Sequence, residues 1–186
     1  MTEKEAPVSV GTIEPRLTLA EFDALPDDGE WRELLDGRVL VTPAPRPIHQ
    51  TAAGNLYTLL RAARTPDLLV YFAPFDYRPG GPTSLQPDVL VCHRQDVGPQ
   101  GVQRPLLLAV EVASPSTRHQ DVMRKRLLYE AHGVQSYWIF EPEDAVLVVL
   151  ELKNGRFVDR VFKDDEVFEA ELPYPVRIVP AELLEY

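Results

Sequence analysis

Short apolar runs alternate along this chain with segments whose apolar residues recur every three or four positions. The first pattern is typical of strands and the second of amphipathic helices. Two dipeptides, Asp36-Gly37 and Asn154-Gly155, each lie between apolar runs and predict tight hairpin turns. The predicted strands are residues 31–35, 38–41, 68–72, 88–92, 106–113, 136–140, 145–152 and 156–162. The chain therefore predicts a sheet that includes antiparallel hairpins.

Two segments in the first third of the chain carry the helical pattern. In residues 17–26, Thr18 and Glu21 have the spacing of a capping box, and Pro26 ends the segment. Residues 48–64 form the second predicted helix, which follows a proline-rich connector. The apolar residues at helical spacing in this second segment are Ala52, Leu56, Leu59, Leu60 and Ala63.

The strand predicted at residues 106–113 is apolar at successive positions, and only Glu111 interrupts it. A strand without alternation is expected to have both faces covered, as in the centre of an α/β sheet. Residues 121–132 predict a helix that ends before Gly133. The residues expected on the apolar face of this helix are Met123, Leu127, Leu128 and Ala131. Together these elements predict an α/β fold with a mixed sheet, flanking helices and antiparallel hairpin additions.

The length of 186 residues suits one domain with its own hydrophobic core. Residues 1–16 hold charge and proline without periodicity, so we expect a flexible tail followed by a domain at residues 17–186. The single cysteine, Cys92, excludes an internal disulfide and favours a reducing, cytoplasmic setting. The sequence has no apolar run of about 18 residues, so no membrane span is predicted.

The chain is acidic, with 29 acidic and 19 basic residues and a formal net charge of −10. This charge argues against a protein that coats nucleic acid by bulk attraction. The acidity lies toward the ends, because residues 41–150 hold ten acidic and ten basic residues. Residues 118–126 hold four bases against one acid, Asp121, and predict either a small basic patch or an ordinary solvated helix face. The four bases are Arg118, Arg124, Lys125 and Arg126.

Two carboxylates stand out by their positions. Asp88 opens one predicted strand, and Glu111 lies inside the next long one. If these strands pair, the carboxylates converge near one end of the sheet, where a hard divalent cation such as Mg²⁺ would offset the cost of burying them. The competing interpretation is that Asp88 only caps its strand, and that Glu111 pairs with an arginine or faces solvent.

The segment after Glu111 adds a candidate cation. Residues 114–117, Ser-Pro-Ser-Thr, break the strand and lead into the predicted helix that carries Lys125. The junction of a strand and a following helix is where α/β proteins place ligands. An ammonium group there can stabilise charge on a reacting phosphoryl group or orient the attacking water. Alternatively, Lys125 is a surface lysine paired with Asp121 one turn earlier.

The order of these motifs resembles the Uma2 family of endonucleases, which belongs to the PD-(D/E)xK, or restriction-endonuclease-like, group. The matching positions are residues 31–45, His49-Gln50, residues 86–89, residues 110–118, Asp121, Lys125, Tyr129, Gly133 and Tyr137-Trp138. The resemblance covers the chain from about residue 17 to the C-terminus. It implies a restriction-endonuclease-like fold, with a mixed β-sheet flanked by helices.

The resemblance also implies roles for individual residues. Asp88 and Glu111 are expected to ligate Mg²⁺ or Mn²⁺, together with the main-chain carbonyl of Val112. The position of the usual motif lysine holds Ala113, so Lys125 is expected to reach the site from the next helix. The expected supporting residues are Glu33, Gln50 and Asp121, and the expected phosphate contacts are Arg118, Arg124 and Arg126.

The implied function is hydrolysis of DNA phosphodiester bonds by metal-activated water, with a homodimer as one expected assembly. The alternative is a nuclease-fold protein without activity that binds nucleic acid or another protein, which Ala113 and the net charge of −10 favour. His49 is predicted to be an ordinary surface histidine, with a position at the border of the site as the less favoured alternative. The sequence holds neither a glycine-rich phosphate loop nor a Gly-x-Ser-x-Gly nucleophile motif.

Overall fold

The computed structural model describes residues 16–113 and 120–185, except for the side chains of residues 120 and 121. A six-stranded sheet forms its centre, with the strand order β10-β9-β8-β7-β4-β3. These strands are β3 (Leu68–Phe72), β4 (Val89–His93), β7 (Leu108–Val112), β8 (Ser136–Glu141), β9 (Val146–Lys153) and β10 (Arg156–Lys163). Strands β7 and β8 are parallel, and the other neighbours are antiparallel. The sheet is therefore mixed, as predicted.

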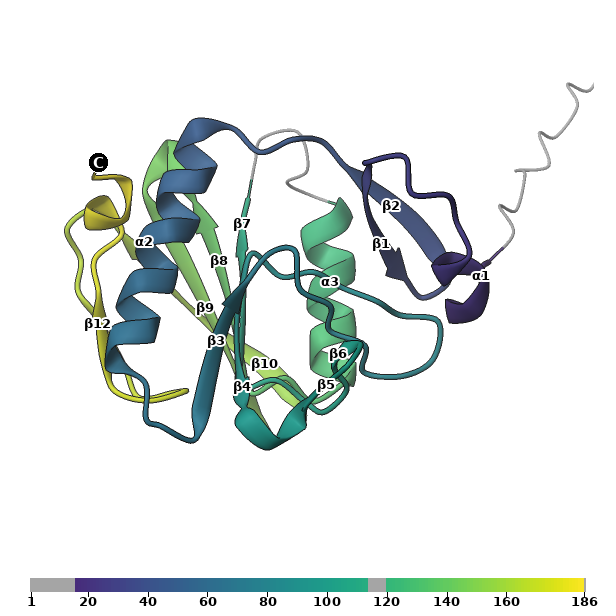
Figure 1. The fold of residues 1–186 in the computed structure, drawn as a ribbon. Coiled ribbons are helices and arrows are strands. Elements are labelled where there is room, and N and C mark those ends of the chain that lie inside the picture. The colour runs from purple at the N-terminus through teal and green to yellow at the C-terminus, as the bar shows by residue number, and fades with distance from the viewer. Residues whose placement is uncertain (1–15, 114–119, 186) are drawn as a thin grey trace, which may run out of the picture.

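Two helices cover the two faces of this sheet. Figure 1 shows α2 (Pro47–Ala63) and α3 (Gln120–Ala131) on opposite sides of it. The α2 residues buried against the sheet are Ala52, Leu56 and Leu60. Leu59 and Ala63, which were predicted on the same face, are exposed. All five residues of β7 are buried, which confirms that this strand is covered on both faces.

The first hairpin lies beside α3, away from the large sheet (Figure 1). Strands β1 (Trp31–Leu35) and β2 (Arg38–Thr42) pair through a turn in which Asp36 has a φ of 49° and Gly37 a φ of 81°. Both values are left-handed, as a two-residue hairpin turn of this kind requires. The main chain of Leu34 exchanges hydrogen bonds of 2.8 and 2.9 Å with Ser84, which ties β1 to the segment before β4.

Smaller elements complete the described chain. The helix α1 (Leu19–Asp23) has the predicted capping box, because Glu21 accepts the N–H of Thr18 at 2.8 Å and the Thr18 hydroxyl accepts the N–H of Glu21 at 3.2 Å. The remaining elements are η1 (Arg94–Asp96), β5 (Val97–Gly98), β6 (Gly101–Val102), η2 (Pro142–Asp144), β11 (Phe168–Ala170), β12 (Val176–Ile178) and η3 (Ala181–Leu184). The first fifteen residues of the predicted tail lie outside the described residues. No helix in the described part of the chain is long and apolar enough to cross a membrane.

The prediction for the buried face of α3 is wrong for Met123, Leu127 and Ala131, which are exposed, and is confirmed for Leu128, which packs partly buried against the core. Met123 and Leu127 are 51% and 61% exposed, whereas Lys125 and Tyr129, one turn apart, are buried. Burying a lysine is costly unless the ammonium is paired. The side of α3 that faces the protein therefore combines Lys125, which is paired with the acidic groups beneath it, with Tyr129 and the partly buried Val122 and Leu128.

Candidate active site

The pairing of β4 with β7 brings two carboxylates to the same end of the sheet. Val89 lies opposite Val110 in this antiparallel pair. Continuing the register by one residue sets Asp88 opposite Glu111. The Asp88 Oδ2 atom accepts the main-chain N–H of Val112 at 2.7 Å, so this carboxylate is fixed against the end of β7.

Lys125 lies between two buried carboxylates that come from different strands. Its Nζ atom is 2.8 Å from Oε2 of Glu33 on β1, and 2.9 Å from both carboxylate oxygens of Glu111 on β7. The three residues are only 5 to 9% exposed. The lysine therefore reaches the acidic centre from α3, although the position two residues after Glu111 holds Ala113.

Burial and charge together set the protonation of this cluster. Burial is the main reason why the pKa of Glu111 is raised to about 7. The charge of Lys125 lowers this pKa, and the charges of Glu33 and Asp88 raise it. Burial would lower the pKa of Lys125, but the charges of Glu111 and Glu33 outweigh it and hold that pKa above its usual value. Lys125 is consequently an ammonium group at neutral pH, which suits it to stabilise negative charge and not to act as a base.

Glu111 and Glu33 each accept one further hydrogen bond. The hydroxyl of Tyr129, one turn after Lys125 on α3, donates to Oε1 of Glu111 at 2.8 Å. The main-chain N–H of Gln86 donates to Oε1 of Glu33 at 2.6 Å. Burial and the charge of Glu111 raise the pKa of Tyr129 well above its usual value, which keeps this hydroxyl protonated as a donor. The role of Tyr129 in positioning Glu111 was not predicted from the sequence.

We expect Tyr129→Phe to lower the free energy of unfolding by about 1.5–3 kcal/mol, because it removes a buried hydrogen bond to a charged group. The matched control is Tyr137→Phe. The hydroxyl of Tyr137 is also buried but has no hydrogen-bond partner within the described residues, so its loss is expected to be neutral or slightly stabilising. Urea denaturation of both variants at pH 7.5 measures the difference. Equal stabilities of the two variants would contradict the proposed role of the Tyr129 hydroxyl.

His49 is part of this site and not an ordinary surface histidine as predicted. It lies in the first turns of α2, and its Nε2 atom is 3.2 Å from Oδ2 of Asp88. Burial would lower the pKa of His49, but the hydrogen bond and the charge of Asp88 outweigh it, with smaller contributions from Glu111 and the main chain of Val112, so the pKa is raised. Each carboxylate of the pair Asp88 and Glu111 thus has its own basic partner, His49 for Asp88 and Lys125 for Glu111.

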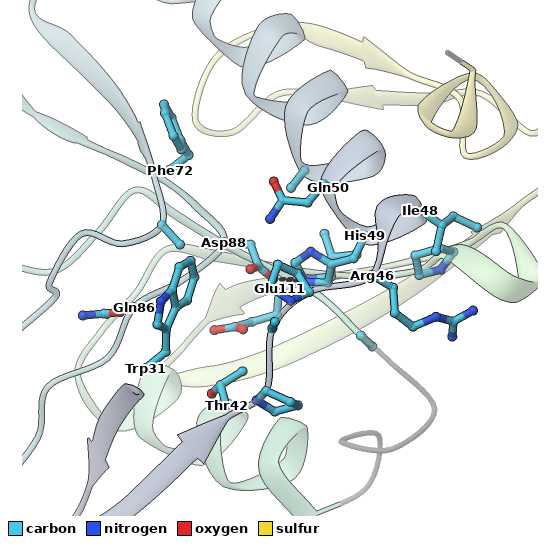
Figure 2. Close-up of a pocket in the computed structure, with 18 of the residues that line it drawn as sticks. Trp31, Thr42, Arg46, Ile48, His49, Gln50, Phe72, Gln86, Asp88 and Glu111 are labelled. Carbon is cyan, nitrogen blue, oxygen red and sulfur yellow. Dashed lines mark hydrogen bonds and ion pairs between the residues drawn. The ribbon is translucent and has the colours of Figure 1, made fainter. Parts of the chain in front are cut away.

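These groups line a cleft with a volume of about 720 Å³. Figure 2 shows Asp88, Glu111 and His49 together at its centre, with Trp31 and Phe72 toward one side and Arg46 toward the other. Gln50, a predicted supporting residue, is exposed and lines the cleft from α2. Glu33, Val112 and Lys125 also line it, so most of the predicted site residues share one cavity.

Of the three arginines predicted to contact phosphate, the two that the structure describes do not line this cleft. Arg124 is exposed on α3 and Arg126 lies 4.0 Å from Asp159, and neither lines the cavity. Arg118 and the side chain of Asp121 lie outside the described residues. Lys125 is the described base of the predicted patch that points toward the carboxylates, and Arg124 and Arg126 lie outside the cavity.

The carboxylate ligands that this cleft offers are compatible with a hard divalent cation that keeps several of its water ligands. Mg²⁺ is often held by one or two carboxylates with water completing the shell, and Asp88 and Glu111 supply two. Within the described residues, no three His, Cys, Asp or Glu side chains are grouped as a cage for an ion. The buried Nδ1 atom of His49 has no hydrogen-bond partner within the described residues, whereas its Nε2 atom contacts Asp88.

Comparisons with known proteins agree with this architecture. A solved structure described as a "putative nuclease belonging to DUF820", from Anabaena variabilis, superimposes with a TM-score of 0.73. The alignment covers 90% of this chain and 97% of that chain at 19% sequence identity, which establishes a similar fold. No curated protein matches the chain. The model of the Uma2 family, described as "Putative restriction endonuclease", matches residues 19–181, so this chain belongs to the Uma2 family.

Proposed function

We propose that this protein is a metal-dependent endonuclease that hydrolyses DNA phosphodiester bonds in the cleft around Asp88 and Glu111. The observation that carries the proposal is the convergence of these two carboxylates with the Lys125 ammonium in one cavity. Clustered ionisable groups with shifted pKa values in a cleft are typical of functional sites. The family description and the nuclease-like fold of the Anabaena variabilis protein support the same reaction class.

In this proposal, Asp88, Glu111 and the main-chain carbonyl of Val112 would hold Mg²⁺ or Mn²⁺. A divalent ion at such a site supplies Lewis-acid polarisation of phosphate oxygens and lowers the pKa of water. Lys125, held by Glu33 and Glu111, provides a fixed positive charge for the reacting phosphate. The hydroxyl of Tyr129 keeps Glu111 in place through its hydrogen bond of 2.8 Å.

The charge balance of the cleft favours a requirement for metal. Three carboxylates, those of Glu33, Asp88 and Glu111, face only the cations Lys125 and His49 at the centre of the site. A phosphate group adds further negative charge to this balance and is repelled by carboxylates at close range. A bound divalent cation would reverse the sign of the net charge at the centre of the cleft and allow the phosphate to approach.

A binding module without activity is the second candidate, and one observation favours it. Lys125 contacts both oxygens of Glu111, and His49 contacts Asp88, so each of these two carboxylates already has a basic partner in the chain itself. In that case the cluster would stabilise the fold, and the cleft would bind nucleic acid or protein without cleaving it.

Cleavage assays separate the two candidates. We expect the protein to nick supercoiled plasmid or to cut single-stranded circular DNA when Mg²⁺ or Mn²⁺ is present, and to stop when EDTA is added. The products are followed on agarose gels over time, with protein preincubated in EDTA as the control. DNA that remains intact with both metals would favour the binding module, and cleavage that persists in EDTA would exclude metal dependence.

A further inference from the structure

The cleft holds the most exposed aromatic side chains of the described residues. Trp31, at the start of β1, is 42% exposed, and Phe72, at the end of β3, is 58% exposed. Both line the cavity that contains Asp88 and Glu111, and Figure 2 shows the two rings on the same side of Asp88. Large apolar side chains that remain in contact with water beside a polar site indicate a surface for a ligand.

Both aromatic side chains project from ordered elements. Phe72 packs edge-on against Tyr57 of α2, with ring centroids 4.9 Å apart and an interplanar angle of 73°. The guanidinium of Arg61 lies 5.8 Å from the centroid of Tyr57. Trp31 is paired with Thr42 in the first hairpin. The main-chain positions of both residues are therefore set by the fold, and both side chains remain accessible in the cleft.

The arginine and lysine side chains that line the cleft each form an ion pair with a carboxylate. Arg46 contacts Glu143 at 2.5 Å, and Arg32 contacts Glu30 at 3.0 Å. Lys125, the third basic side chain that lines the cavity, lies between two carboxylates. Binding of duplex DNA depends chiefly on basic side chains that neutralise its phosphates. Binding of unpaired strands relies instead on stacking of bases against aromatic rings, which does not depend on sequence.

We propose that the substrate of this cleft is an unpaired DNA strand, whose bases stack on Trp31 and Phe72 while its backbone crosses the carboxylate centre. This inference rests on the proposed nuclease function and narrows its substrate to single-stranded DNA or to unpaired regions of a duplex. In a duplex the bases are stacked on one another, so the two rings would have no free base face to contact.

Intrinsic fluorescence provides a direct test, because the chain has two tryptophans and Trp138 is fully buried. Quenching by DNA therefore reports on Trp31. A single-stranded 12-mer of mixed sequence and the same 12-mer as a duplex are titrated into the full chain at 100 mM salt with Ca²⁺, a hard divalent cation that takes oxygen ligands and offsets the charge of the carboxylates. We expect the single strand to quench the fluorescence at concentrations at least about tenfold lower than the duplex requires.

Substitutions separate stacking from other effects. Binding of a fluorescently labelled 12-mer is followed by anisotropy, and Trp31→Ala and Phe72→Ala are each expected to weaken it by about tenfold, whereas Trp31→Phe retains most of the affinity. The control is Leu127→Ala, which changes a side chain that is 61% exposed on α3 and does not line the cleft. Thermal melting establishes that each variant is folded.

Equal affinity for duplex and single strand, or unchanged binding by Trp31→Ala and Phe72→Ala, would overturn the inference. The two proposals fail in different ways. Metal-dependent cleavage of duplex DNA without Trp31 quenching would contradict the stacking inference and leave the nuclease function intact. Quenching by single strands without cleavage in Mg²⁺ or Mn²⁺ would support the stacking surface and contradict the nuclease function.

Discussion

Asp88→Asn is expected to lower the rate of metal-dependent DNA cleavage by about 10³-fold or more while leaving the fold intact. A divalent ion contributes several kcal/mol of charge stabilisation in such reactions, and each 1.36 kcal/mol corresponds to a factor of about ten in rate. An asparagine oxygen can still accept the N–H of Val112, which Asp88 now binds at 2.7 Å. The measurement is the initial rate of plasmid nicking in Mg²⁺, with thermal melting as a check on folding.

Glu130→Gln is the matched control for this substitution. Glu130 also accepts a main-chain N–H, that of Phe157 at 2.6 Å, and its side chain is 12% exposed. It does not line the cleft, so its amide variant is expected to cut DNA at the wild-type rate. Wild-type rates in Asp88→Asn would contradict the assigned role of Asp88, and equal losses in both variants would indicate a general effect of removing buried carboxylates.

Lys125→Met is expected to lower the free energy of unfolding by about 3–5 kcal/mol at pH 8, because it leaves Glu33 and Glu111 buried without their shared cation. Urea denaturation measures this change. The control is Arg124→Met on the same helix, where the side chain is exposed and the expected change is within about 0.5 kcal/mol. Similar stabilities of the two variants at pH 8 would contradict the proposed importance of the buried ammonium.

The difference in the free energy of unfolding between the wild-type protein and Lys125→Met is expected to become smaller as the pH falls. The pKa of Glu111 is already raised from 4.5 to about 7, and the charge of Lys125 is what limits this increase. Without that charge the pKa of Glu111 in the variant lies above about 7, so above about pH 7 the folded variant retains a proton that the folded wild-type protein has released. The stability of the variant relative to the wild-type protein therefore increases as the pH falls toward about 7. A deficit that is the same at pH 5.5 and pH 8 would exclude ionised Glu111 as the cause.

Local features of the chain allowed the framework of the fold to be predicted. The turns at Asp36-Gly37 and Asn154-Gly155 depend on the left-handed backbone of their own residues, with φ values between 49° and 81°. The pairing of β9 with β10 follows directly from the second of these turns. The apolar run around β7, which only Glu111 interrupts, likewise indicated a strand covered on both faces. These signals are short-range, so a single sequence is sufficient to locate them.

The buried face of α3 could not be predicted from apolar spacing, because the groups that decide it lie on other elements. Glu33 comes from the first hairpin and Glu111 from the central strand, and both contact Lys125. The apolar pattern of the helix indicated the opposite face, on which Met123 and Leu127 are in fact exposed. The strand–helix junction after Glu111 indicated Lys125 as a candidate cation for the site, and the resemblance to the Uma2 family added the expectation that it replaces the motif lysine missing at Ala113.

His49 shows a second limit of the sequence. Its contact with Asp88 depends on the proline-rich connector, which sets the first turns of α2 against the end of β4. No spacing rule within the chain relates residue 49 to residue 88. A polar residue directly after a rigid connector, at the start of a helix that packs on the sheet, is the signal that could have identified it.

The central claim is that Asp88 and Glu111 share one divalent cation, and calorimetric titration of Mn²⁺ into the wild-type protein and the variants Asp88→Asn and Glu111→Gln tests it most directly. The wild-type protein is predicted to bind one ion per chain, with affinity reduced at least about tenfold in each variant. Identical isotherms for the three proteins, or a wild-type protein that cuts DNA without binding the ion, would contradict the account.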